Sequence, residues 1–192
     1  MRLRQMLDQL LDFTQTRLGR ALTLHRQRTD LGPVARHVID ELEAYHPAST
    51  FVLERDGDLN GDWDAGRLAQ VISNLGGNAV QHGRAERPIT VRLQGLAAEV
   101  RVSVHNEGPA IPKELRARIF DPLTRGAGGR LPPHKGSIGL GLYICRQIVL
   151  AHGGTIEVAS DAQGTTFRFT LPRETAPEAA LALAPGPQRA AP

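Results

Sequence analysis

Residues 68–83 show a helical pattern of hydrophobic and polar positions with two distinct faces. The apolar residues recur at the spacing of a helix packed on a core, and they are Leu68, Val71, Ile72, Leu75 and Ala79. The neighbouring face carries amides rather than charges: Gln70, Asn74, Asn78 and Gln81, with His82 beside it. A solvent-facing helix would normally carry Lys and Glu, because asparagine is a poor helix former and adds no charge. We therefore interpret this face as ligand-facing, with an ordinary amide-rich polar face as the alternative.

The rest of the chain predicts a mixture of helices and strands. Helices are expected over about 2–18, 32–45, 113–120 and 141–151. Strands are expected over about 22–29, 51–54, 89–94, 100–104, 155–159 and 165–171, with turns at 56–58 and 60–61. Apolar and polar residues alternate in the strands at 89–94 and 100–104, which indicates a sheet with one buried and one half-exposed face. Asp62 or Asp64 is the expected N-cap of the amide-faced helix.

The first expected helix has a wide apolar stripe, formed by Leu3, Met6, Leu7, Leu10, Leu11, Phe13 and Leu18. Such a stripe must be covered, because a helix face this apolar is not stable in water. The helix either docks on the domain that follows it or pairs with another chain. We favour pairing.

Two glycine-containing segments are candidates for ligand contact. The first, His105-Asn106-Glu107-Gly108-Pro109-Ala110-Ile111-Pro112, follows a strand and could hold the edge of a flat ligand, with a simple turn as the alternative. The second, Gly139-Leu140-Gly141-Leu142, begins an apolar helix. Phosphate could approach the free N–H groups there, and the helix dipole favours negative charge. Close helix packing would also select these glycines.

Between these segments, residues 121–137 are rich in glycine and proline and break every periodic pattern. A loop of this length inside a compact domain is typically a functional lid or disordered. Its basic residues, Arg125, Arg130, His134 and Lys135, would suit an anionic ligand or would simply keep a solvated loop soluble.

Composition narrows the classes of function. Hydrophobic residues make up 41% and aromatic residues 4% of 192 positions, which is enough for one aliphatic core and an appendage. The net charge of +3 is too balanced to indicate nucleic-acid binding. The single cysteine, Cys145, excludes a disulfide framework and favours a reducing, cytoplasmic compartment. The sequence shows no membrane-length apolar run and no signal peptide, so we expect a soluble protein. From Arg173 the Ala/Pro-rich sequence predicts a disordered tail.

Five segments of the chain resemble, in order, the N, G1, F, G2 and closing glycine boxes of sensor histidine kinases. They are Asn74-Leu75-Gly76-Gly77-Asn78-Ala79, Asn106-Glu107-Gly108, Ile119-Phe120-Asp121-Pro122, Gly139-Leu140-Gly141-Leu142 and Gly164-Thr165. A single box is a weak signal, whereas five in register are a strong one. The ATP-binding domain of these kinases belongs to the gyrase, Hsp90, histidine kinase and MutL superfamily.

This resemblance implies an α+β fold, a two-layer α/β sandwich of the Bergerat ATP-binding type with a mixed sheet and an N-terminal helix. Residues 1–20 would be the second helix of a dimerisation and phosphoacceptor hairpin, 21–172 the ATP-binding catalytic domain and 173–192 the tail. The parent protein would form a homodimer through the N-terminal helix, with its catalytic part in the cytoplasm. Whether a membrane anchor precedes this part is left open.

The same resemblance implies an ATP and Mg²⁺ site between the helices. Asn78 would hold Mg²⁺ through its carbonyl oxygen. Asn74 lies where the ATP hydrolases of the superfamily keep a glutamate as general base. Because an amide cannot take a proton, water would stay poorly activated while an imidazole nucleophile is awaited. Asn106 would face the adenine amino group. The other expected contacts of ATP are Gln81, His82, Gly108, Ile111, Phe120, Arg125, Lys135, Ser137, Gly139, Leu140, Gly141, Leu142 and Thr165.

Three residues depart from the family pattern. Asn106 replaces an aspartate and accepts a hydrogen bond from an amino group less strongly, which implies weaker or less selective nucleotide binding. Gln81 stands where many relatives have a lysine that reaches the phosphates, so a charge-assisted contact is lost. Ser137 replaces the first glycine of the G2 box. We interpret these departures as a variant site rather than an inactive one.

The phosphoacceptor histidine of the family is followed by an acidic residue, whereas the seven histidines here are followed by Arg, Val, Pro, Gly, Asn, Lys and Gly. The chain thus resembles the C-terminal part of a kinase and is expected not to phosphorylate itself. We predict an ATP- and Mg²⁺-dependent protein-histidine kinase domain that modifies a histidine on a separate or missing acceptor helix, upstream of a response regulator. The alternatives are a nucleotide-binding dimerisation or scaffold module without turnover, and a serine kinase of the anti-sigma type.

Overall fold

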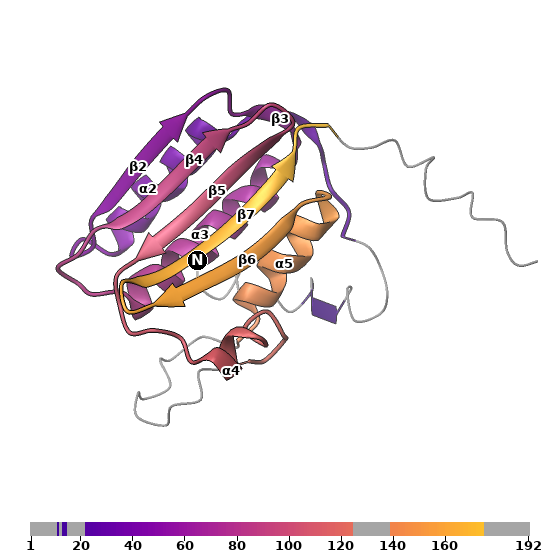
Figure 1. Cartoon of the computed structure of the whole chain (residues 1–192). Helices are drawn as coiled ribbons and strands as arrows, with labels where there is room; N and C mark the ends of the chain where they lie inside the picture. Colours follow the sequence, from indigo (N-terminus) through magenta and orange to yellow (C-terminus); the bar gives the residue numbers. More distant parts are fainter. Residues whose placement is uncertain (1–10, 12, 15–21, 125–138, 175–192) are drawn as a thin grey trace, which may run out of the picture.

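The computed structural model describes Leu11, Phe13, Thr14 and residues 22–124 and 139–174 of the chain (Figure 1). A five-stranded sheet forms one layer of this structure, in the order β2-β4-β5-β7-β6. The strands are β2 (Phe51–Asp56), β4 (Ile89–Gly95), β5 (Glu99–Asn106), β6 (Thr155–Asp161) and β7 (Gly164–Pro172). β2 and β4 run parallel, and every other neighbouring pair is antiparallel. The predicted mixed sheet is therefore confirmed.

Three helices cover one face of the sheet and form the second layer (Figure 1). They are α2 (Leu31–Tyr45), α3 (Ala65–His82) and α5 (Gly141–Ala151), and a short α4 (Lys113–Arg116) lies outside this layer. α3 packs between α2 and α5. A β-carbon on Gly76 would lie 2.5 Å from Leu42 Cδ1, so this glycine permits the close approach of α2 and α3. The two-layer α/β sandwich expected from the sequence is thus confirmed.

The core between the two layers is almost entirely aliphatic, as the composition predicts. The predicted apolar stripe of α3, from Leu68 to Ala79, is buried in it. Inward-facing residues alternate along the central strands, as Val100, Val102 and Val104 do on β5. Trp63, the one tryptophan of the chain, is also fully buried and donates its indole N–H to Pro172 O at 2.8 Å.

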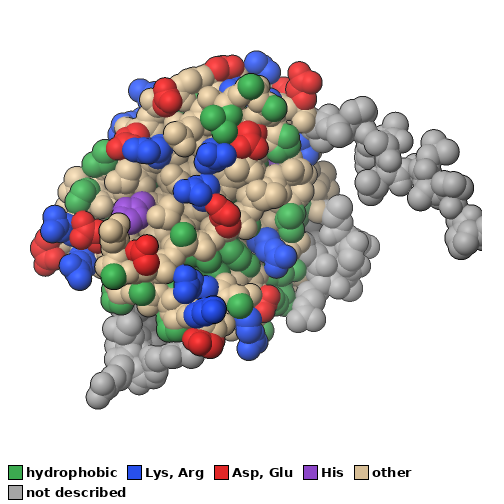
Figure 2. Space-filling view, viewed as in Figure 1, with side chains coloured by type: hydrophobic (Ala, Val, Ile, Leu, Met, Phe, Trp, Pro, Cys, Tyr) green, Lys and Arg blue, Asp and Glu red, His purple; other side chains and the backbone are tan. Residues whose placement is uncertain are grey.

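The opposite face of the sheet is open and covered with charged side chains (Figure 2). Two ion pairs bridge neighbouring strands on this face, Glu54 with Arg92 and Glu157 with Arg168. All four side chains are more than 40% exposed, so each pair adds little stability. The alternation seen in the sequence therefore separates a buried face from a solvated one.

Three predictions of local structure were wrong. The strand expected over 22–29 is formed only as β1 (Gln27–Asp30), and residues 22–26 have no regular secondary structure. Residues 60–61 were expected to form a turn, but they lie in β3 (Asn60–Trp63), which pairs antiparallel with β1 (Gln27–Asp30). The turn preference of Asn-Gly is overridden here by the antiparallel pairing of Asn60 with Asp30 and of Gly61 with Thr29, and a β-carbon on Gly61 would lie 2.3 Å from Trp63 Cζ2. The helix expected over 113–120 ends at Arg116 and continues as turns.

The N-terminal helix is described only at Leu11, Phe13 and Thr14, so most of the expected helix at 2–18 lies outside the described residues. Phe13 packs edge-on against Tyr143 of α5, with ring centroids 5.7 Å apart. At this residue the helix docks on the domain behind it, which was the less favoured of the two expected partners. No helix in the described part of the chain has the length and hydropathy that crossing a bilayer requires.

Arg173 ties the end of β7 to two turns of the sheet. Its Nε donates to Leu96 O at 3.0 Å in the β4–β5 turn. Its terminal nitrogens donate to the Asp58 carboxylate at 3.3 Å and to the backbone carbonyls of Asp58 and Asn60. Residues 175–192 of the expected tail lie outside the described residues.

We predict that Arg173→Ala lowers the free energy of unfolding by about 2 kcal/mol, because several charge-assisted hydrogen bonds are lost at a largely buried side chain. Urea unfolding followed by circular dichroism measures this change. Arg168→Ala is the matched control, since its ion pair is exposed and is expected to contribute about 0.5 kcal/mol. Equal losses for the two variants would contradict the assignment of Arg173 as a structural clamp.

Candidate nucleotide-binding site

The buried face of the sheet ends in polar side chains on three adjacent strands. On β5, Asn106 follows the inward-facing valines, and on β7, Thr165 occupies the matching position beside it. Ser160 of β6 pairs in register with Thr165. The three residues are only 5%, 5% and 7% exposed. A buried hydrophobic face thus becomes a buried polar row at this edge, defined here as Asn106, Thr165 and Ser160.

The polar row is connected by hydrogen bonds. The hydroxyls of Ser160 and Thr165 lie 2.8 Å apart and share a hydrogen bond. Ile111 N donates to Ser160 Oγ at 2.9 Å, which fixes the loop after β5 over the row. Asn106 Nδ2 donates to Glu107 O over a long 3.4 Å. Ser160 was not among the predicted site residues, although it is the next inward position of β6 after Val158.

Gly108 holds the loop after β5 against the C-terminal end of α3. A β-carbon at this position would lie 2.6 Å from His82 O, and 3.2 Å from Asn106 Nδ2. No side chain fits in this space. A glycine is therefore required at this position for the loop to pack against α3.

The amide face of α3 continues from this loop toward α5. Asn74 and Asn78 are half-buried, whereas Gln81 and His82 are exposed. A β-carbon on Gly77, between the two asparagines, would meet no atom within 4 Å. The amide face is therefore open beside Gly77, whereas the Nδ2 atom of Asn74 is buried.

α5 begins directly above Asn74. A β-carbon on Gly141 would lie 3.8 Å from Asn74 Cγ and Oδ1, so the two predicted segments meet. Leu140, at the N-cap position, is buried and makes no side-chain capping bond. The first intrahelical bond runs from Ile144 N to Leu140 O, which leaves the earlier N–H groups of the first turn without helical partners.

The approach to α5 is fixed by a left-handed backbone conformation. Gly139 has φ +78° and accepts a hydrogen bond of 3.0 Å from Leu123 N. Leu123 itself has φ +60°. The residues on either side of 125–138 are thereby brought together. Arg125, Lys135 and Ser137, which were predicted to contact ATP, lie outside the described residues.

Phe120 and Ile111 support the site from the core side. The Phe120 ring packs edge-on against Phe167 of β7, with centroids 6.2 Å apart. Both predicted residues are partly buried against the hydrophobic core.

Cys145 lies beneath Asn74 and is fully buried in α5. Burial raises the pKa of the thiol to about 12, although a hydrogen bond with the Asn74 side chain opposes this shift. The cysteine is therefore a neutral packing residue rather than a nucleophile.

A comparison of the sequence with protein families identifies the family of this chain. The model of the histidine kinase-, DNA gyrase B- and HSP90-like ATPase family matches residues 63–175, which include α3, the polar row and α5. The chain belongs to this ATPase family.

Curated relatives of this chain include a bacteriophytochrome and a sensor histidine kinase. The chain is 32% identical to a bacteriophytochrome of Pseudomonas aeruginosa over 89% of its own length and 23% of the relative's. It is also 32% identical to the sensor histidine kinase GlrK of Escherichia coli, over 88% of its length and 36% of the relative's. The chain therefore spans roughly a quarter to a third of the length of these relatives.

Solved structures agree with this assignment. The catalytic domain of histidine kinase ThkA superposes with a TM-score of 0.66 at 32% identity, covering 78% of this chain and 96% of that domain. Full-length ShkA in complex with AMPPNP gives a TM-score of 0.74 at 28% identity, covering 88% of this chain and 35% of ShkA. The ATPase is thus an ATP-binding catalytic domain of the histidine kinase type, as its five boxes predict.

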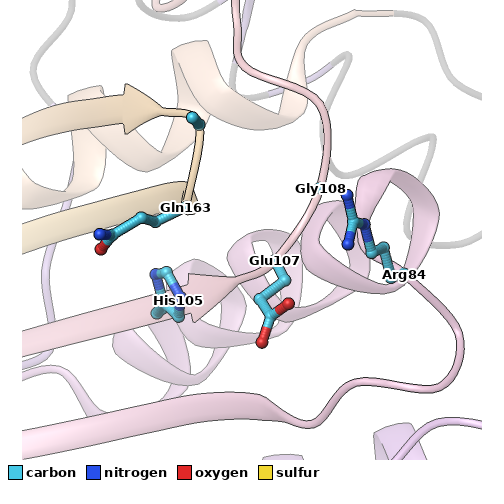
Figure 3. Close-up of a pocket in the computed structure, with 6 residues that line it drawn as sticks. Arg84, His105, Glu107, Gly108 and Gln163 are labelled. Carbon is cyan, nitrogen blue, oxygen red and sulfur yellow. The ribbon is translucent and has the colours of Figure 1, made fainter.

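A separate cavity of about 370 Å³ lies on the other side of β5 from the polar row (Figure 3). Its lining residues are Arg84, His105, Glu107, Gly108, Ala162 and Gln163. His105 points away from Asn106 because successive strand residues face opposite sides of a sheet, and its Nδ1 lies 2.9 Å from Thr166 Oγ1. Only Gly108 of the predicted site residues borders this cavity.

The N-terminal end of α3 is anchored to the end of α5 by a buried histidine. Asp64 N donates to His152 Nε2 at 3.1 Å, and His152 Nδ1 donates to Ile148 O at 2.8 Å. The ring is fully buried. Since Nε2 accepts a bond in this arrangement, the ring is neutral and carries its proton on Nδ1.

The Asp64 side chain is the N-cap of α3, one of the two predicted caps. Its carboxylate accepts hydrogen bonds from Arg67 N at 3.0 Å and from His25 N at 2.8 Å. Burial alone would raise the pKa of Asp64, but these hydrogen bonds lower it below its usual value, and the charge of Arg67 acts in the same direction.

We predict that stability falls as the pH drops below about 6.5, the ordinary pKa of histidine. Burial lowers the pKa of His152, and the Arg26 charge adds to this effect, while the Ile148 carbonyl and Asp64 oppose it. The unfolded chain therefore takes up a proton at a pH where the folded ring does not, so stability present at neutral pH is lost on acidification.

The urea midpoint at pH 7.5 and at pH 5.5 measures this loss. The wild-type protein is expected to lose stability between the two values, and His152→Gln is expected to lose markedly less. His37→Gln is the control, because His37 is an exposed histidine of α2. The same pH dependence in wild type and His152→Gln would show that His152 is not responsible.

Proposed function

We propose that this chain binds Mg-ATP between the amide face of α3 and the start of α5, and transfers the γ-phosphoryl group to a histidine on an acceptor helix in two-component signalling. One observation carries the proposal. Gly141, at a helix start without a side-chain cap, lies over Asn74, while Gly77 leaves the neighbouring space open.

The phosphates would lie where the N–H groups of the first turn of α5 point. The N-terminal end of a helix attracts anions through these free donors and its dipole. Gly139, Leu140, Gly141 and Leu142 would supply backbone contacts, with Arg125, Lys135 and Ser137 as further candidates.

The residues that the structure describes fit a magnesium ion held mainly by its nucleotide. The described part of the chain contains no cluster of three or more His, Cys, Asp or Glu that could hold a metal by itself. Mg²⁺ binds oxygen, keeps several waters and is often held by substrate phosphates with one or two protein ligands. The half-buried Asn78 amide can supply one such oxygen. When bound, the ion would neutralise charge on the transferred phosphoryl group.

The base would lie against the polar row at the other end of α3. Asn106 and Thr165 would face its polar edge, and Ile111, Phe120 and Gly108 would form the adjoining walls. Gln81 and His82 are exposed near the end of α3 and could border the nucleotide.

Asn74 would favour transfer of the phosphoryl group to histidine over hydrolysis of ATP. A hydrolase must remove a proton from water, and the neutral amide of Asn74 cannot do so. An imidazole supplied by an acceptor helix needs no such base to attack phosphorus, so transfer to histidine would be favoured over hydrolysis.

The acceptor would be a histidine on a separate or missing acceptor helix, because none of the seven histidines of this sequence precedes an acidic residue. We divide the chain into a hairpin helix at 1–20, a catalytic domain at 21–172 and a tail at 173–192. We further propose that the parent protein dimerises through the hairpin helix, that its catalytic part lies in the cytoplasm and that its partner is a response regulator. The structure of ThkA in complex with the response regulator TrrA, which covers 90% of this chain at 30% identity with a TM-score of 0.71, supports the last point.

We predict that Asn78→Leu abolishes Mg-ATP binding without unfolding the protein, because the substitution removes the proposed magnesium ligand from a half-buried helix position. Isothermal titration calorimetry measures the affinity, and a thermal melt confirms the fold. Gln94→Leu removes an amide from β4 at the opposite end of the sheet from Asn106, where Gln94 pairs with Arg101, and is expected to retain binding. Normal affinity in Asn78→Leu would refute the assignment of this site.

We also predict the fate of the phosphoryl group when the chain is incubated with γ-labelled ATP, Mg²⁺ and the acceptor hairpin of a sensor histidine kinase. The hairpin is expected to acquire acid-labile label, typical of phosphohistidine, whereas the chain alone acquires none. Acid-stable label would favour a serine kinase. Nucleotide binding without any label would indicate a module without turnover.

A further inference from the structure

We propose that the base pocket accepts purine nucleoside triphosphates with either an amino or an oxo group at position 6, so that ITP binds nearly as well as ATP. This inference rests on the proposed function, because it assumes that the base lies against Asn106, Thr165 and Ser160. It concerns selectivity among nucleotides, which neither the family nor the relatives determine.

The argument starts from the hydrogen-bonding character of the polar row. All three side chains are neutral and nearly fully buried. An amide carries an acceptor oxygen and a donor nitrogen with two hydrogens, and a hydroxyl can donate or accept. Unlike an ionised carboxylate, which only accepts, none of these groups has a fixed polarity.

The Asn106 side chain can form a hydrogen bond with a purine that carries either a 6-amino or a 6-oxo group. Its Nδ2 lies 3.4 Å from Glu107 O, a long hydrogen bond that uses one of two hydrogens. The Oδ1 atom can accept from the 6-amino group of adenine. The second Nδ2 hydrogen, or the amide turned by 180° with loss of only the weak bond to Glu107, can donate to a 6-oxo group.

The hydrogen bond between the Ser160 and Thr165 hydroxyls can also run in either direction. Ser160 Oγ accepts from Ile111 N at 2.9 Å, and its bond of 2.8 Å with Thr165 Oγ1 can run in either direction. When Ser160 donates, the Thr165 hydroxyl hydrogen is available to an acceptor on the ligand. When Thr165 donates to Ser160, its lone pairs can accept from a donor on the ligand.

The charged side chains nearest in sequence to the polar row point elsewhere. They therefore do not determine which groups of the row donate and which accept hydrogen bonds. The Glu107 carboxylate lies 3.4 Å from Arg87 Nε. Arg116 Nη1 donates to the Ser160 backbone carbonyl at 2.9 Å rather than to its hydroxyl. The row can therefore reorganise its hydrogen bonds around either base.

Selectivity follows from this arrangement. A site loses much affinity for an analogue when a buried polar group is left unpaired. Here the same atoms can pair with both 6-substituents, so only small differences in geometry remain. A carboxylate at position 106 would instead face a 6-oxo group with an acceptor against an acceptor.

The test compares ATP with ITP, which differ at position 6 and in protonation of the adjacent N1, while the 2-amino group of guanine is avoided. Competition against a fluorescent ATP analogue, with the full 192-residue chain and Mg²⁺ at pH 7.5, gives the ratio of the dissociation constants of ITP and ATP. The expected ratio in the wild-type protein is at most about tenfold, equivalent to about one hydrogen bond.

Asn106→Asp is expected to raise this ratio by a further factor of ten or more. Gln163→Glu is the matched control, because it adds the same charge in the exposed β6–β7 turn and should leave the ratio unchanged. A wild-type ratio above tenfold would overturn the proposal even if Asn106→Asp did not fold. A folded Asn106→Asp protein with an unchanged ratio would also overturn it.

Failure of the proposed function has a different signature. In that case the wild-type protein would bind neither nucleotide, or Asn78→Leu, which acts on the phosphate end, would leave ATP binding intact. An ATP-selective protein whose binding is abolished by Asn78→Leu would retain the proposed function and lose only the inference about position 6.

Discussion

The packing of α3 against its neighbours is the constraint on which the site depends. One face of this helix is buried against the sheet and α2, where Gly76 permits close contact with Leu42. Its N-terminal end is held by Asp64 and, through His152, by the end of α5. Its C-terminal end lies against Gly108. Only the amide face is left for a ligand, and its side chains are positioned by a helix that is fixed at both ends.

The sheet supplies the second part of the site by a change in the chemistry of its buried face. Hydrophobic residues fill the inward positions of β5, β6 and β7 until the edge near α3, where Asn106, Ser160 and Thr165 take their place. Burying these polar groups is favourable only because they form hydrogen bonds with one another, the backbone or a ligand. The same strands therefore hold the fold together and present a polar surface to a base.

Much of the fold could be predicted from the sequence. The alternation of Val100, Val102 and Val104 identifies a half-buried strand, and the apolar stripe beside the amides of α3 identifies a helix on a core. The family boxes identified the segments that the structure then brings together, such as Asn74 with Gly141. These predictions succeed because each depends on a local pattern with a single structural solution.

The features that the sequence did not reveal depend on contacts between distant residues. Asn60-Gly61 has the composition of a turn, but its pairing with β1 makes it a strand. The bond between Asp64 and His152 joins residues 88 positions apart, and nothing near either residue signals it. Ser160 lies near the end of β6, and its register with Thr165 places it in the polar row.

A crystal structure of the full chain with Mg²⁺ and a non-hydrolysable ATP analogue would test the central claim most directly. Our account predicts that the phosphates lie between the Asn78 side chain and the first N–H groups of α5, with the base against Asn106 and Thr165. A nucleotide bound on the opposite side of β5, in the cavity lined by Arg84, His105 and Gln163, would contradict it.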